Sequence, residues 1–113
     1  MLSHVVLMTP RSDLSPAERQ ALLDAFTRAA HEIETVRGVR VGRRVLHGAA
    51  YESIAPDTGA FLVVIDFDDL AGLQAYLRHP AHDALGARFN QSYRSALIYD
   101  FDVGGLERLA GLA

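Results

Sequence analysis

The sequence predicts an α+β domain in which strands and helices follow one another in the order βαββαβ. Two observations lead to this expectation. Four short segments are rich in β-branched and apolar residues, as strands are. A long amphipathic pattern of helical spacing separates the first two of them, and a helical region precedes the last. This order is typical of a ferredoxin-like fold, in which an antiparallel four-stranded sheet carries its helices on one face.

The first strand is expected at residues 3–9, SHVVLMT, and the long helix follows it. The start of the helix is marked by a capping pattern, with Ser15 as N-cap, Pro16 at the first helical position and Glu18 completing the capping box. Gly38 is expected to stop this helix. The apolar residues that recur between these limits at helical spacing are Leu22, Ala25, Phe26, Ala29, Ile33 and Val36.

The second strand is expected at residues 39–47, and the third and strongest at residues 60–68, AFLVVIDFD. The stretch between them has turn residues at its end and is expected to be a loop. Asp68 or Asp69 can cap the shorter helix that follows.

Pro80 either ends this shorter helix or opens another helical segment that runs towards residue 93. The last strand is expected at residues 95–103. We therefore expect one domain at residues 1–104, followed by a Gly-rich C-terminal tail at residues 105–113.

Composition restricts the class of protein. Half of the 113 residues are apolar, which is enough for a packed core, and the net charge is −3 without any dense basic run, so no nucleic-acid partner is expected. Cysteine is absent, which excludes disulfides and thiolate metal sites. No secretory leader and no apolar run of membrane-spanning length is evident, so we expect a cytoplasmic protein without a membrane partner.

Both faces of the predicted sheet are apolar, whereas a sheet with one solvated face should alternate apolar and polar residues. The simplest cover for the second face is a second copy of the sheet, so we expect a homodimer with sheet-to-sheet packing. The C-terminal tail could instead fold back as a lid, but it looks too short and too rich in Gly. One face holds Phe61, Val63, Ile65 and Phe67 with His4, Val6 and Met8; the other holds Leu62, Val64 and Asp66 with Val5 and Leu7.

The segment YLRHPAH, residues 76–82, concentrates the titratable side chains around a proline. His82 can act as a proton acceptor near neutral pH, and the Tyr76 hydroxyl can orient it or donate to an enolate. The alternatives are a histidine that packs at a helix start and a buried core tyrosine. His79 is expected to be a corner residue, because the following proline favours extended backbone at residue 79. His4 is either a pocket residue or a core imidazole.

His79 and His82 have the spacing H-x-x-H, but zinc usually needs a third protein ligand. No third ligand is evident, so no metal site is expected. No cofactor is expected either, because abstraction of an acidic α-proton by His82 with Tyr76 requires none. Motifs for nucleotide binding, serine hydrolases and zinc proteases are absent from the sequence.

Taken in order, the segments SHVVLM, FLVVIDF, LQAYLRHPAH and SALIYDFDV resemble the stress-responsive dimeric α/β-barrel (Dabb) family over nearly the whole chain. The resemblance implies a ferredoxin-like fold and a homodimer. It also relates the chain to plant polyketide cyclases of the olivetolic acid cyclase type. In such cyclases the residues that match His82 and Tyr76 are the proposed base and its partner, and a strand-one histidine matches His4. A pocket histidine of these cyclases is replaced here by Phe61.

We therefore expect a stress-responsive homodimer that binds a small, largely apolar keto or aromatic ligand between helices and sheet. His4, Phe61, Phe26 and His79 are the expected contact residues. The alternative is a cofactor-independent cyclase or isomerase in which His82 is the base and Tyr76 its partner. A cofactor-free monooxygenase is a weaker alternative, because a fold by itself does not determine the chemistry.

Overall fold

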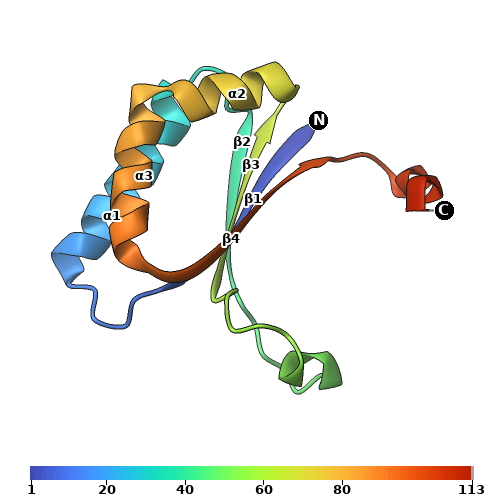
Figure 1. The fold of residues 1–113 in the computed structure, drawn as a ribbon, viewed down its shortest axis with the longest axis horizontal. Helices are drawn as coiled ribbons and strands as arrows, with labels where there is room; N and C mark the ends of the chain where they lie inside the picture. Colours follow the sequence, from blue (N-terminus) through green and yellow to red (C-terminus); the bar gives the residue numbers. More distant parts are fainter. Residues whose placement is uncertain (113) are drawn as a thin grey trace.

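The computed structural model describes residues 1–112, so the last residue of the expected tail lies outside the described part. The elements follow the predicted βαββαβ order with the second helical region divided in two (Figure 1). Their bounds are β1 Leu2–Pro10, α1 Pro16–Glu32, β2 Gly38–Arg43, β3 Phe61–Phe67, α2 Leu70–Arg78, α3 Pro80–Ser92 and β4 Tyr93–Asp102, with 3₁₀ helices η1 Ala50–Ser53 and η2 Leu106–Leu112. The strands form one antiparallel sheet in the order β2-β3-β1-β4, which confirms the ferredoxin-like α+β fold.

The start of α1 agrees with the sequence, but its end does not. The Glu18 N–H donates to the Ser15 hydroxyl at 3.1 Å, as the capping pattern predicts. The helix ends at Glu32, so the expectation that it continues to Gly38 is wrong. Ile33 already has extended backbone and is buried in the core. The Thr35 hydroxyl then donates to the Gly72 carbonyl at 2.8 Å, a long-range contact that an extended chain makes and a continuing helix would break.

Pro80 opens a new helix. Asp69 caps α2 by accepting from the Gly72 N–H at 2.9 Å. His79 then closes α2 through its N–H, which donates to the Tyr76 carbonyl, and caps α3 through its Nδ1, which accepts from the Ala81 N–H at 2.9 Å. One residue thus serves both helix ends, so Tyr76 near the end of α2 and the first turn of α3 lie close together.

The second strand is shorter than expected, because β2 ends at Arg43 rather than at residue 47. The chain from residue 44 to residue 60 then leaves the sheet, forms η1 and returns to β3, and in Figure 1 this excursion projects away from the body. Its apolar side chains are exposed: Val45, Leu46, Tyr51 and Ile54.

The helices lie on one side of the sheet (Figure 1). Alternate residues of β1 and β3 face them and are paired across the two strands, for example Val6 with Val63 and Met8 with Phe61. These side chains form the core with residues of the three helices, and the largest fully buried side chains are Phe67 and Tyr76.

The opposite sheet face is apolar and has no helix over it. On β4 the aromatic side chains of Tyr99 and Phe101 are both 51% exposed, and their ring centroids lie 6.2 Å apart. The tail does not cover this face either, since Leu106 and Leu109 of η2 are themselves exposed. The radius of gyration, 15.5 Å, exceeds the roughly 13 Å typical of a compact chain of this length, because the η1 excursion and the tail extend outward.

Candidate functional site

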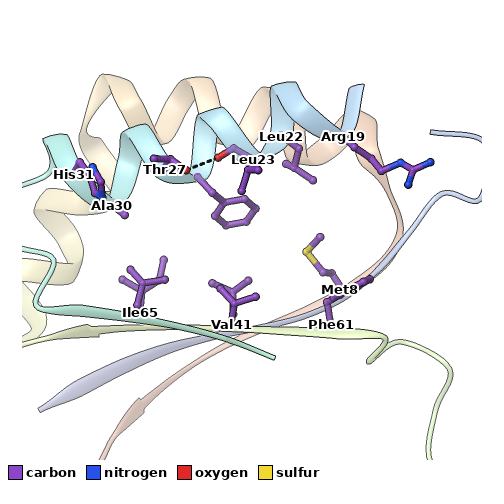
Figure 2. Close-up of a pocket in the computed structure, with 13 residues that line it drawn as sticks. Met8, Arg19, Leu22, Leu23, Thr27, Ala30, His31, Val41, Phe61 and Ile65 are labelled. Carbon is purple, nitrogen blue, oxygen red and sulfur yellow. Dashed lines mark hydrogen bonds between the residues drawn. The ribbon is translucent and has the colours of Figure 1, made fainter. Parts of the chain in front are cut away.

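An apolar cavity with a volume of about 330 Å³ lies between α1 and the sheet (Figure 2). This volume is at the lower end of the range typical of small-molecule sites. Helix α1 forms its roof with Leu22 and Phe26, and the strands form its floor. The floor residues are Met8 of β1, Val39 and Val41 of β2, and Phe61, Val63 and Ile65 of β3.

Two of the predicted contact residues line this cavity from opposite walls. Phe26 lies on α1, and its ring also meets that of Phe89 edge-on, with the ring centroids 6.4 Å apart. Phe61 rises from the start of β3, and the guanidinium of Arg43 lies over its ring, 5.7 Å from the centroid. These contacts fix the two aromatic walls in place.

Three other predicted residues form an aromatic cluster of their own. The rings of Tyr76 on α2 and His82 on α3 meet edge-on, with their centroids 4.8 Å apart. The ring of His4 on β1 approaches Tyr76 from the sheet side at 5.8 Å. The Nδ1 of His4 is hydrogen-bonded to the Asp100 carboxylate on β4 at 2.6 Å, which orients this imidazole.

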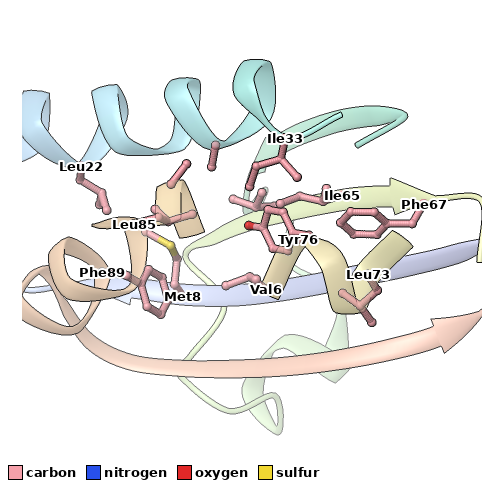
Figure 3. Packing of buried hydrophobic residues seen from close by; sticks show 13 residues of the cluster. Val6, Met8, Leu22, Ile33, Ile65, Phe67, Leu73, Tyr76, Leu85 and Phe89 are labelled. Atoms are coloured by element: carbon pink, nitrogen blue, oxygen red, sulfur yellow. The ribbon is translucent and has the colours of Figure 1, made fainter. Parts of the chain in front are cut away.

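The cluster adjoins the cavity without lining it. His4 is the cross-strand partner of Ile65, and Ile65 lines the cavity floor. Figure 3 shows the Tyr76 ring beside Ile65, with its hydroxyl on the side of Leu85 and away from Phe67. The aromatic cluster therefore lies next to the Ile65 end of the apolar cavity.

Burial shifts the pKa values of Tyr76 and His82 in opposite directions. Desolvation raises the pKa of Tyr76 to about 12, so its hydroxyl keeps its proton at neutral pH. Desolvation also lowers the pKa of His82, and the nearby His4 lowers it further, while Asp83 and a backbone hydrogen bond at Leu77 act in the other direction. Near neutral pH the pair therefore offers one hydroxyl donor and one neutral imidazole that can accept a proton.

The side chain of His79, also a predicted contact residue, belongs neither to the cavity nor to the aromatic cluster. Its ring nitrogen caps α3, and it does not line the cavity. Two residues that the sequence analysis does not single out belong to the aromatic cluster or to the cavity. They are Asp100, which is hydrogen-bonded to His4, and Arg19, which lines the cavity at the start of α1.

Within residues 1–112, no group of three or more side chains suited to hold a metal ion is found, and no helix is long and apolar enough to cross a membrane.

The lowered pKa of His82 predicts how stability depends on pH. The unfolded chain, in which His82 titrates near its ordinary value of 6.5, binds the proton more readily than the folded chain does. The contribution of His82 to stability is thus complete above this pH and declines as the pH falls below it. We expect the loss in Tm between pH 7 and pH 5 to be smaller for His82→Gln than for the wild-type protein. Equal losses would show that His82 is not desolvated.

Comparisons with protein families and with known proteins agree on the relatives of this chain. The model of the stress responsive A/B barrel domain, Dabb, matches residues 2–103. Olivetolic acid cyclase of Cannabis sativa is 19% identical over 100 residues, which cover 88% of this chain and 94% of the cyclase.

Solved structures show the same fold. A hydroxynitrile lyase from Passiflora edulis has a TM-score of 0.76 at 11% identity, covering 91% of this chain and 93% of the lyase. A dimeric ferredoxin-like protein from Thermobifida fusca has a TM-score of 0.69 at 22% identity, covering 90% of each chain. The family match spans nearly the whole chain and agrees with the resemblance expected from the sequence. The chain therefore belongs to the stress responsive A/B barrel domain (Dabb) family.

Proposed function

We propose that this protein is a homodimer that binds a small, largely apolar ligand in the cavity between α1 and the sheet. The observation that supports this most directly is the cavity itself, about 330 Å³ with walls almost entirely of carbon. Apolar hollows of this size with a few polar groups nearby are the usual form of small-molecule sites. One such polar group is the Tyr76 hydroxyl near the Ile65 end, and the His82 ring meets that of Tyr76 with the centroids 4.8 Å apart.

The proposed dimer buries the sheet face that has no helix over it. Val5 and Leu7 of β1 lie beside Tyr99 and Leu97 of β4 on this face, so its centre is continuous hydrocarbon. An exposed apolar patch of this kind usually marks an interaction site. The dimeric ferredoxin-like relative from Thermobifida fusca supports a second copy as the partner.

Proton transfer is a second candidate function, supported by the opposite pKa shifts of Tyr76 and His82. A neutral imidazole can remove an α-proton from a keto compound, and a protonated phenol can donate to the enolate that forms. We propose His82 as the base and Tyr76 as the donor. No cofactor is needed for such a step, because the proton moves to the imidazole and the electron pair stays on the enolate.

Filling the cavity tests the binding proposal. Ala30 lines the cavity from α1, so Ala30→Phe places a ring inside it, whereas Ala71→Phe adds the same ring at an exposed position of α2. A screen of aromatic and aliphatic keto compounds by thermal shift is expected to give hits with wild type and Ala71→Phe but not with Ala30→Phe. A ligand at 100 times its Kd should stabilise the protein by about 2.7 kcal/mol, which is easily measured. Equal shifts in all three proteins would place the ligand elsewhere.

A further inference from the structure

The apolar cavity continues at its Phe61 end into a second hollow with a volume of about 540 Å³. Four residues line both spaces: Met8, Arg19, Leu22 and Phe61. The second hollow adds polar groups that the first lacks, namely Thr9, Arg11 and Ser12. The joined space is therefore more polar at this end and more apolar along the first cavity.

Two arginines near this junction have no carboxylate partner among residues 1–112. Arg19 lines both hollows, and Arg43 contacts Phe61, which also lines both. Arg19 comes from the start of α1 and makes only a long hydrogen bond to the Leu14 carbonyl, at 3.4 Å. Arg43 comes from β2 and lies over the ring of Phe61. Among the ion pairs of residues 1–112, neither of the two takes part, whereas Arg28, further along α1, is held by Glu32 at 3.0 Å.

Two carboxylates beside the second hollow already have a cation, since both pair with Arg11, which lines it. Arg11 contacts Glu18 at 2.8 Å and Asp13 at 3.4 Å, so these two carboxylates are partly neutralised within their own cluster. The positive N-terminal end of the α1 dipole also lies near the junction, since Arg19 is the fourth residue of the helix. The balance of charges at the junction therefore favours binding of an anion.

We propose that the ligand of this site is an amphipathic carboxylate, with its apolar part in the cavity and its carboxylate at the junction beside Arg19 and Arg43. This inference rests on the proposed ligand-binding function and adds the charge of the ligand to it. A planar guanidinium suits a carboxylate, because two parallel N–H groups can donate to its two oxygens. Both arginines are exposed, so their attraction for the carboxylate is that of a partly solvated ion pair.

The shape of the cavity also favours an extended tail. Its α1 lining repeats on one helix face from Arg19 to His31, a distance of about 18 Å at the rise of an α-helix. The side chains between these ends that face the cavity are mostly apolar, with Leu22, Phe26 and Ala30 along its length. A chain or a substituted ring can lie along this face while its head group stays near Arg19.

The test uses three probes with the same tail, octanoate, octanol and octylamine, measured by isothermal titration calorimetry with the full-length protein. We expect octanoate to bind most tightly and octylamine most weakly. Arg19→Gln is expected to weaken octanoate binding about 10-fold, near the lower end of the value of a charge-assisted hydrogen bond because Arg19 is exposed, and to leave octanol unchanged. Arg28→Gln removes an arginine from the same helix away from the cavity, and it should alter neither affinity.

The outcomes separate this inference from the function on which it rests. Tighter binding of octanoate that depends on Arg19, and weakens as salt is added, supports the proposal. If octanol and octanoate bind equally, or if Arg19→Gln affects both alike, the carboxylate proposal is overturned while ligand binding in the cavity stands. If no probe binds to wild type, the proposed ligand-binding function fails as well.

Discussion

Replacing Leu97 and Tyr99 by arginine should convert the proposed dimer into monomers. Both side chains lie on the sheet face without helices, opposite Leu7 and Val5 of the central strand β1. Sheet-to-sheet packing would bury the new charges of both subunits in one apolar layer. An unpaired charge in such a layer costs several kcal/mol, and the twofold symmetry of the dimer repeats it in the partner.

The measurement is molar mass by light scattering or sedimentation at micromolar concentration. We expect wild type at twice the chain mass and the double variant at 12.3 kDa. Leu77→Arg is a matched control, because Leu77 is a partly exposed apolar residue of α2, away from the sheet. This control should remain a dimer. A monomeric wild-type protein, or a double variant that still forms dimers, would contradict the sheet-to-sheet proposal.

The parts of the fold that could be predicted from the sequence are those with a local physical cause. The Ser15 cap depends on a residue three positions away, and the Asp69 cap does too, so each is visible in a short window. The end of α1 depends instead on Ile33 entering the core and on a hydrogen bond from Thr35 to Gly72. Helical periodicity cannot show such long-range contacts, so the sequence pattern predicts a helix as far as Gly38.

The same distinction holds for the candidate site. Tyr76 and His82 are six positions apart and meet because a proline-directed corner folds α2 and α3 together, which the motif itself suggested. The contact of His4 with Asp100 joins β1 to β4 and depends on strand register, which composition and spacing do not encode. Arg19 carries no site signal in the sequence, because only the packing of α1 over β3 reveals the cavity beside it.

Tyr76→Ala is expected to lower the free energy of unfolding by about 3–5 kcal/mol, as removal of a large buried aromatic side chain does. The Tyr76 side chain is 1% exposed and contacts the rings of Phe67, His4 and His82. Tyr76→Phe keeps this packing and removes only the hydroxyl, so it should change stability by about 1 kcal/mol or less. Urea denaturation followed by circular dichroism measures both. A similar loss in the two variants would mean that the hydroxyl, rather than the ring, holds this region together.

The stable Tyr76→Phe variant then separates structure from chemistry. If Tyr76 and His82 transfer a proton, the protein will accelerate deuterium incorporation at the α-carbon of an aromatic β-keto ester, followed by NMR in D₂O. Tyr76→Phe and His82→Gln should each reduce this acceleration by about 100-fold, since general acid–base groups contribute at least that much. His47→Gln is the control, because His47 is an exposed residue between β2 and η1 whose ring is hydrogen-bonded to Tyr51, away from Tyr76 and His82. Exchange at the rate of buffer alone in wild type would leave Tyr76 and His82 as packing residues beside a binding cavity.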